Sequence, residues 1–579
     1  MAPALQKYDW ILALTSIAFI VSSTSNGAND VANSYATSVA ARTLKMWQAG
    51  ILASCTEFLG AVALGSRVTG TIKSGIFSLD KFKPAPATLM LAMGCAELGS
   101  ATFLTIATIS GFPVSTTQTV VGALIGSGIA AQAPIKWSWQ KGSVSQIAAS
   151  WLIAPFISAG FAAILFGTVK YGVLKRSDPL KWGLRAIPFY LAFTAGVLAL
   201  FIIDELPEGE SLEEMGAGKA CGIILGVFAG VLLIAYVFFL PYFHRRLVRG
   251  DSRIRVWHIP LGPLLWREDP PLYFPAKGGL VVTDYYAKAA ASNNSSDGAL
   301  VDEKSKGHST SVDNKTSGSG DDEITAPADL ERGEVQGGRN PETDLVMHVI
   351  PAKPEPEERW LKPVEHLPHY HPQKIGAWIK FLLLQGVNRD VVTQKNMAAI
   401  HARAAVYDNK VEHLWTYAQV ASAMMMSIAH GSNDVANAVG PWVATYNTFQ
   451  TGVASKEADT PIWILVIAGL LLGTGFWFYG YHIVRALGNK ITQVSPTRGF
   501  SMELGAAICV LLASRLGLPV STTQCLTGAT IGVALMNFDV KAVNWKQVAF
   551  IFSGWIITLP SAGLISGLLM AMALNTPHF

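Results

Sequence analysis

The sequence predicts an all-α polytopic membrane protein with about 12 membrane elements in two inverted-topology repeats, plus a long cytoplasmic loop. Half of the residues are hydrophobic, only 15% are charged, and the mean hydropathy is +0.35. Several apolar runs approach or exceed the ~20 residues that cross a ~30 Å hydrocarbon core. Two polar motifs each occur twice in or beside such runs. We therefore also expect broken or re-entrant helices near these motifs.

The apolar runs define the membrane elements in chain order. The first run, from Trp10, has no basic segment before it and no small-residue cleavage site after it, so we expect a retained span. Some of the shorter runs are expected to be re-entrant half-helices. The expected elements are 10–28, 48–66, 87–110, 113–130, 147–171, 186–203, 218–243, 412–431, 461–482, 500–515, 518–537 and 547–573.

The runs fall into four segments of the chain. Residues 289–345 are rich in Ser, Gly, Asp, Asn, Glu and Lys, which predicts disorder. The apolar stretch 376–388 is too short to span and predicts an interfacial helix. The expected division is a first inverted repeat (1–171), two linking transmembrane helices (172–243), a cytoplasmic insert (244–405) and a second inverted repeat (406–579).

Basic residues in short loops predict the orientation. Lys and Arg gather at 170–185, at 245–255 and at 485–498, whereas 204–214 is acidic. This pattern places both termini outside and the central loop in the cytoplasm, although Arg67 and nearby lysines fall on the opposite side. We expect a multi-pass protein of the plasma membrane.

Other protein classes find little support. The net charge of +4 is small, and no nucleic-acid partner is expected. No catalytic triad or metal cluster is apparent, so we expect no enzyme and no cofactor. The five cysteines, without CxxC spacing, are interpreted as small hydrophobic residues: Cys55, Cys95, Cys221, Cys509 and Cys525.

The first repeated motif is GFPVSTTQ at 111–118 and GLPVSTTQ at 517–524. Proline suits the first turn of a helix, and the hydroxyl groups that follow can cap backbone N–H groups or face a ligand. A helix N-terminus also favours an oxyanion. The alternative is a proline-kinked span whose hydroxyls bond to their own helix, but repetition of all six PVSTTQ residues favours a binding function.

The second repeated motif is NGANDVAN at 26–33 and HGSNDVAN at 430–437. Gly27 and Gly431 predict a local break in each helix, and the Asn and Asp side chains supply hard oxygen ligands for a small cation such as Na⁺. We expect Asp30 and Asp434 each to coordinate a cation in its own half-site. The alternative, asparagines that hold helices together, explains the buried aspartates poorly.

The charge of these motifs has a consequence for coupling. They contain no Lys or Arg, so no such side chain neutralises a bound anion, and the two aspartates add negative charge. Cations that arrive with the substrate must then balance the charge. Three more acids, Glu57, Glu97 and Glu503, lie in apolar segments and are candidates for coupling or gating, or for purely structural bonds.

The paired motifs closely resemble those of the inorganic phosphate transporter (PiT) family, over about 5–240 and 395–575, and the chain looks like a fungal member. The resemblance implies twelve membrane elements, inverted repeats and Na⁺-coupled phosphate symport. It also implies functional roles for Glu57 and Glu503, and substrate contacts for Ser115 and Ser521. Asn26 departs from the family, which often has an apolar residue there, so the preference for Na⁺ over H⁺ is less firmly implied than phosphate.

We therefore expect a secondary active transporter that imports inorganic phosphate by symport with sodium ions, through alternating access at a midplane site. The alternatives are a phosphate sensor or receptor, and proton-coupled symport. Expected partners are phosphate, arsenate as a competitor, Na⁺, membrane lipid and, if the chain dimerises, a second copy in a homodimer. The expected phosphate ligands are Ser115, Thr116, Thr117, Ser521, Thr522, Thr523, Asn29 and Asn433, and the expected sodium ligands are Asp30, Asn33, Gln118, Asp434, Asn437 and Gln524.

Overall fold

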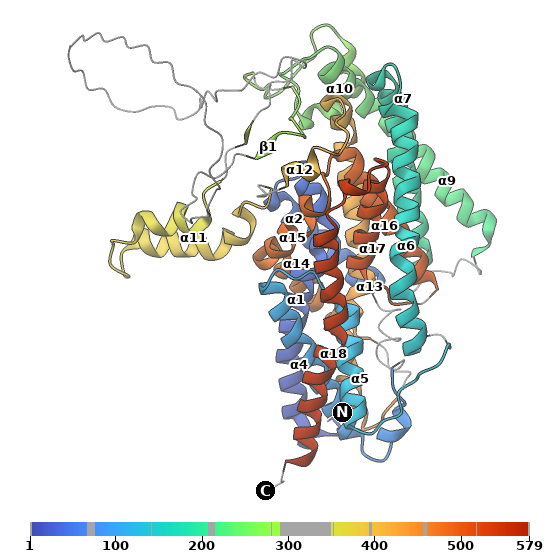
Figure 1. Ribbon diagram of the computed structural model, residues 1–579, viewed down its shortest axis with the longest axis vertical. Helices are drawn as coiled ribbons and strands as arrows, with labels where there is room; N and C mark the ends of the chain where they lie inside the picture. Colours follow the sequence, from blue (N-terminus) through green and yellow to red (C-terminus); the bar gives the residue numbers. More distant parts are fainter. Residues whose placement is uncertain are drawn as a thin grey trace, which may run out of the picture. The chain divides into compact units, whose positions relative to one another are not determined.

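Helices form almost all of the structure (Figure 1), a computed structural model that describes residues 3–65, 76–140, 142–205, 215–278, 281–289, 349–350, 353–392, 397–455, 460–516 and 518–576. The α-helices are α1 (Asp9–Ala40), α2 (Met46–Leu64), α4 (Pro86–Ile109), α5 (Thr116–Ala130), α6 (Val144–Val169), α7 (Pro179–Glu205), α9 (Ala217–Ile234), α10 (Leu240–Phe243), α11 (Pro372–Asn388), α12 (Ala398–His401), α13 (Asn409–Thr451), α14 (Ile462–Tyr479), α15 (Tyr481–Ile491), α16 (Pro496–Arg515), α17 (Thr522–Leu535) and α18 (Trp545–Asn575).

The chain divides into two compact units. Met1–Tyr286 and Lys353–Phe579 form the first, and Ala287–Ala352 the second. In the second unit the described elements are two short parallel strands, β1 (Lys288–Ala289) and β2 (Val349–Ile350). Apart from Ala289, the segment 289–345 predicted to be disordered lies outside the described residues. The predicted interfacial stretch 376–388 is helical, as part of α11.

Within the described residues, nine helices are long and apolar enough to cross a membrane: α1, α2, α4, α6, α7, α9, α14, α16 and α18, some with short extensions. The 43-residue helix α13 adds a further element. The helices α5 and α17 have 15 and 14 residues. At 1.5 Å per residue they are shorter than a ~30 Å hydrocarbon core, as expected for half-helices. The predicted fold class, with its twelve elements, is confirmed.

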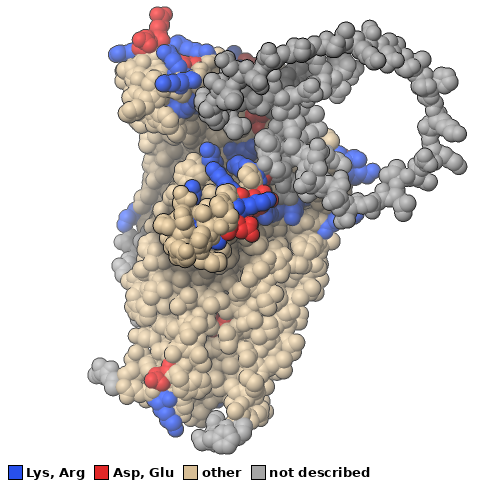
Figure 2. Space-filling model, turned by 90° about the vertical axis from the view of Figure 1, so that its left-hand side faces the viewer, with Lys and Arg blue, Asp and Glu red and all other residues tan. Residues whose placement is uncertain are grey.

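The surface agrees with this membrane assignment. Figure 2 shows a broad face of the protein almost free of charged side chains, with basic and acidic groups gathered above it and a few at its lower end. Large apolar side chains are exposed along α6 and α18, among them Phe156, Ile164, Ile556 and Leu564. Such a belt is unfavourable in water and is what lipid-facing helices present.

The two repeats interlock. The helix α5 packs against α18 of the second repeat, and α17 packs against α6 of the first. In the same reciprocal way α1 packs against α14, and α13 against α2. Exchanged pairs of this kind are what a pseudo-two-fold relation between two repeats produces. The repeats therefore share one core and do not form separate compact units.

The helix breaks predicted at Gly27 and Gly431 are wrong, because α1 and α13 run without interruption through both motifs. The expected elements 10–28 and 412–431 were accordingly too short. Both glycines serve close helix packing instead. A Cβ on Gly27 would lie 1.9 Å from the carbonyl oxygen of Leu472 on α14, and one on Gly431 would lie 2.7 Å from that of Glu57 on α2.

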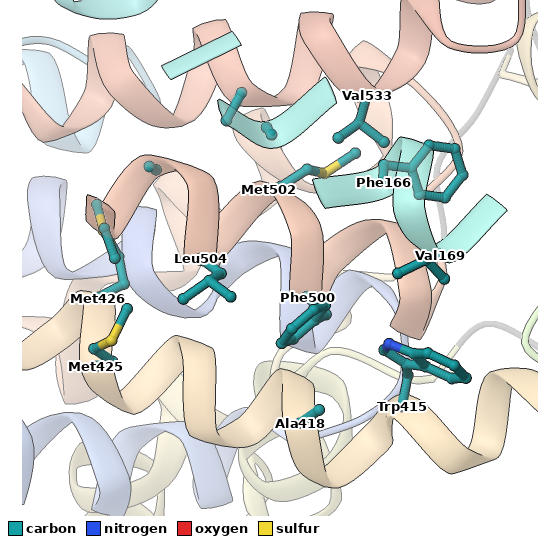
Figure 3. Packing of buried hydrophobic residues seen from close by; sticks show 14 of the residues in the cluster. Phe166, Val169, Trp415, Ala418, Met425, Met426, Phe500, Met502, Leu504 and Val533 are labelled. Atoms are coloured by element: carbon teal, nitrogen blue, oxygen red, sulfur yellow. The ribbon is translucent and has the colours of Figure 1, made fainter. Parts of the chain in front are cut away.

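The largest apolar cluster joins α6, α13, α16 and α17 (Figure 3). Phe166 of α6, Trp415 of α13 and Phe500 of α16 are fully buried in it. A close-packed interior of this kind holds helix backbones in fixed register. The apolar cluster therefore also holds in place the motif residues of α13 and α17.

Candidate functional site

Each PVSTTQ motif forms the start of a helix. Ser115 and Ser521 are the N-cap residues of α5 and α17, and their hydroxyl oxygens accept hydrogen bonds from the backbone N–H of Gln118 at 3.2 Å and Gln524 at 3.3 Å. A serine N-cap of this kind satisfies one of the free donors at a helix start. The predicted helix N-termini are present, but the prolines lie two residues before the caps and not in the first turn.

The two helix starts meet across the repeats. The hydroxyl of Thr117 donates to the carbonyl of Val520 at 3.3 Å, and the equivalent hydroxyl of Thr523 donates to the carbonyl of Val114 at 3.0 Å. In each repeat, one threonine thus forms a hydrogen bond to the segment that precedes the short helix of the other repeat. This exchange creates a single buried centre from two sequence segments about 400 residues apart, as the doubled motifs predict.

Asp30 lies between both helix starts. One oxygen of its carboxylate accepts from the Thr116 hydroxyl at 2.6 Å and the Thr116 N–H at 3.3 Å, both from its own repeat. The other accepts from the Asn33 amide at 3.3 Å and lies 3.0 Å from the Thr523 hydroxyl, whose single hydrogen it shares with the Val114 carbonyl. Asp30 is 1% exposed, so these donors replace the water that a carboxylate needs.

Asp434 has an equivalent place with one difference. Its carboxylate accepts from the Thr522 hydroxyl at 3.0 Å, as Asp30 does from Thr116, and from the Asn433 amide at 2.7 Å. In addition, Nε2 of His430 lies 3.0 Å from Asp434, and Nδ1 of the same ring lies 2.7 Å from Glu57. Of these two contacts only the one between Nδ1 and Glu57 is a hydrogen bond, whereas Nε2 and Asp434 are close without being bonded.

The two aspartates lie in one cluster, and their coordination of cations, each in its own half-site, stays a prediction. Ligand atoms of Asp30, His430 and Asp434 all lie within 4.8 Å of one another. The polar side chains pack at the centre of interlocked repeats, so the two motif copies converge. Two carboxylates this close in a buried site repel each other, and a cation between them or a shared proton relieves that repulsion.

Several buried amide oxygens of the motif residues lack hydrogen-bond donors. Among the described residues, no donor reaches the side-chain oxygens of Asn33, Gln118, Asn433 and Gln524, although all four are buried. Buried carbonyl oxygens without donors are costly unless something else satisfies them. Hard oxygen atoms are the ligands that small hard cations prefer, and the amides of Asn33 and Asn433 contact the two aspartates, so these residues fit the cation predicted from the sequence.

Asn437 and Asn29 play different parts. The amide of Asn437 donates to the hydroxyls of Thr116 at 3.0 Å and Thr117 at 3.1 Å, across the repeat interface. Asn29 is occupied by its own repeat: it donates to Thr108 at 3.0 Å and to the Phe112 carbonyl at 3.1 Å, and accepts from the Val114 N–H at 3.1 Å. Asn29 therefore braces the loop before α5, and its role as a phosphate ligand stays a prediction.

The three further acids are separated by the fold. Glu57 joins the central cluster through His430. Glu503 accepts from Thr37 at 2.6 Å, Ser38 at 2.7 Å and Ser422 at 2.6 Å, which ties α16 to α1 and α13. In contrast, neither carboxylate oxygen of the repeat-equivalent Glu97 accepts a hydrogen bond among the described residues. The equivalent acids thus have unlike surroundings in the conformation seen here.

Sequence reasoning assigned no role to His430, because Asn26 stands at the corresponding position of the first motif. Nothing local distinguishes a histidine that bridges two acids from one that only fills a helix interface. The one signal in the sequence was that His430 has no histidine counterpart in the first motif, although the two motifs otherwise largely match. In the structure Asn26 instead donates to the Asp434 backbone carbonyl at 3.0 Å.

Comparisons with known proteins show which proteins this chain is similar to. The model of the PHO4 phosphate transporter family matches residues 26–566, which include all four motifs. The chain is 39% identical to a phosphate-repressible phosphate permease of Neurospora crassa, over 99% of both chains. It is 28% identical to sodium-dependent phosphate transporter 1-A of Danio rerio, over 97% of this chain and 94% of the relative.

A solved structure described as a sodium-dependent phosphate transporter is similar in fold. It has a TM-score of 0.63 and 22% sequence identity, and the match covers 98% of this chain and all of the other. The likeness extends over the whole arrangement of membrane helices.

Proposed function

This chain belongs to the phosphate transporter family, and from that premise we propose that it imports inorganic phosphate by symport with Na⁺. It is not an enzyme, since its family and relatives are transporters. The relatives named as sodium-dependent support Na⁺ as the coupling ion. The proposal assigns the central cluster as the site of both substrates.

One observation carries the proposal: ligand atoms of two aspartates and a histidine lie within 4.8 Å of one another at the interface of both repeats, and buried amide oxygens of the same motifs lack donors among the described residues. Na⁺ coordinated by Asp30 and Asp434 relieves their repulsion, with Asn33, Gln118, Asn437 and Gln524 as further ligands. A phosphate anion is then attracted by the bound cations. Without bound cations, the negative charge of the cluster repels phosphate. Phosphate transport therefore depends on Na⁺.

The hydroxyls and helix starts supply the donors for phosphate. Ser115, Thr116 and Thr117 face their repeat equivalents Ser521, Thr522 and Thr523 at the N-termini of α5 and α17, where backbone N–H groups also favour an oxyanion. In the conformation seen here these hydroxyls bond to Asp30, Asp434 and to the opposite loop. Binding of phosphate therefore has to exchange some of those bonds.

The remaining features of the proposal concern the cell. Alternating access would move the repeat elements around the central cluster, with Glu97 and Glu503 as gating acids in their unlike surroundings. The protein would lie in the plasma membrane, embedded in lipid, with both termini outside and the central loop in the cytoplasm, as the basic loops indicate. The segment limits and the homodimer stay predictions from the sequence.

A second candidate is proton-coupled symport, which the contacts of Glu57, His430 and Asp434 favour. The imidazole lies within hydrogen-bonding distance of both acids, so it can accept or release a proton at the centre of the site. A proton held on His430 would supply the positive charge that the first candidate assigns to Na⁺.

Uptake by purified protein in liposomes tests both candidates. A Na⁺ gradient alone should drive accumulation of radiolabelled phosphate above equilibrium, and a proton gradient alone should not. Accumulation driven by the proton gradient alone would establish the second candidate. Saturable binding without accumulation under either gradient would support a phosphate sensor or receptor.

Selectivity gives an independent prediction. Phosphate and arsenate carry a proton near neutral pH, and that proton can be donated to a buried carboxylate, whereas sulfate carries none. Leaving a buried acceptor unpaired discriminates by several orders of magnitude. We expect arsenate to inhibit phosphate uptake strongly and a large excess of sulfate to have little effect. Equal inhibition by the two anions would refute the proposed contacts of the site.

A further inference from the structure

A cavity lies outside the central cluster. It has a volume of about 320 Å³, many times the space that one water needs, and its lining includes Gly111, His482, Arg485, Lys490, Gln547 and Phe550. We call it the basic pocket. Of the described residues that line it, three are basic and none is acidic.

The positive charge of the basic pocket is only partly balanced. Arg485 pairs with Glu355 at 2.5 Å, outside the lining, and also donates to the carbonyl of Asp390. Within the described part of the chain, Lys490 forms no ion pair. Burial and the neighbouring Arg485 lower the pKa of Lys490, and burial with Arg389 and Arg485 lowers the pKa of His482. A bound anion would relieve this repulsion.

The basic pocket adjoins the central cluster through the connection between α4 and α5. Gly111, in a left-handed conformation with φ +69°, lines the pocket, and Phe112 follows it. The ring of Phe112 packs on Phe550 of the lining with 4.1 Å between centroids, while its backbone carbonyl accepts from Asn29. Ser115, the cap of α5, is four positions beyond Gly111. One short segment therefore separates the pocket from the central hydroxyl groups.

We propose that the basic pocket is a second binding site for a phosphate group, next to the central site on the α15 end of the protein. Lys490 and His482 would contact the oxyanion, with Arg485 contributing charge and Gln547 a polar wall. This inference rests on the proposed function, because free phosphate would bind there before or after occupying the central cluster. A phospholipid headgroup offers the same chemistry, so the experiment distinguishes the two sources.

Protection of lysine from acetylation tests binding without any transport. The full-length protein in nanodiscs of phosphatidylcholine is treated with an amine-acetylating reagent, in Na⁺-free buffer, and modification is quantified by mass spectrometry. We expect phosphate to slow acetylation of Lys490 several-fold while Lys546, an exposed lysine beside Gln547, reacts unchanged. The protection should persist in D30N, which alters only the central cluster.

Lipid composition separates the sources of the phosphate group. Protection of Lys490 by added phosphate in phosphatidylcholine identifies free phosphate as the ligand. Protection that requires phosphatidic acid in the nanodisc, and not added phosphate, identifies a headgroup. If neither phosphate nor phosphatidic acid protects Lys490 more than Lys546, the basic pocket binds no phosphate group and the inference is wrong.

Transport kinetics give a second readout. With phosphate supplied from the side on which α15 lies, K490Q should raise the KM several-fold and leave the maximal rate nearly unchanged, and K546Q should behave as wild type. The KM from the opposite side should not change. An unchanged KM from both sides overturns a role on the transport path. Failure of the wild type to transport would instead refute the proposed function, and the protection result would still stand.

Discussion

Replacing Asp30 or Asp434 by Asn is expected to raise the Na⁺ concentration needed for half-maximal phosphate uptake by roughly 10- to 100-fold, while the protein still folds and inserts. Interactions of a buried charged group are worth about 1.5–3 kcal/mol each, and 1.4 kcal/mol corresponds to tenfold in affinity. Asn keeps the shape of Asp and still accepts from Thr116 or Thr522, so the helices stay in register. Uptake in liposomes over a range of Na⁺ concentrations measures the effect.

The matched control is Asp269→Asn, which neutralises an exposed acid far along the chain from the motifs and should leave Na⁺ dependence unchanged. Because the two aspartates and His430 lie within 4.8 Å, the effects of D30N and D434N should not add in the double variant. Wild-type Na⁺ dependence in both single variants would place cation binding elsewhere.

Replacing Gly27 by Ala is expected to lower strongly the fraction of the protein that is folded. The added Cβ would lie 1.9 Å from the carbonyl oxygen of Leu472 and 2.6 Å from its Cα, which are backbone atoms of α14 and cannot rotate away. Overpacking in a well-packed core costs about 1–3 kcal/mol and occasionally more, and a clash between two helix backbones belongs at the upper end. Size-exclusion chromatography after heating the detergent-solubilised protein reports the fraction that remains folded.

Gly160→Ala is the control for that experiment. Gly160 also lies within a membrane helix, α6, but a Cβ there has nothing within 4 Å. Because Ala favours helix over Gly by about 1 kcal/mol, this variant should be as stable as the wild type or slightly more stable. Equal heat resistance of G27A and the wild type would mean that α1 and α14 do not approach as closely as described.

The sequence by itself determined the fold class and singled out the residues of the candidate site. Polar residues are costly in apolar segments, so the two motifs stand out without structural information. Their repetition predicts one centre made from two halves, and the structure does bring Asp30 and Thr116 together with Asp434 and Thr522. The start of α5 and α17 at a Ser cap is equally local, since a cap depends only on residues within one turn.

Only the tertiary structure decided which residues of the two repeats touch. Thr523 reaches Asp30, Asn437 reaches Thr116, and His430 links Asp434 to Glu57, all through packing between helices that are distant in sequence. The role of Gly27 also depends on the neighbouring helix α14, because a glycine is compatible either with a break in its own helix or with the close approach of a second helix. A motif fixes the side chains that a helix presents, but the neighbour that they meet depends on how the helices of the two repeats interleave.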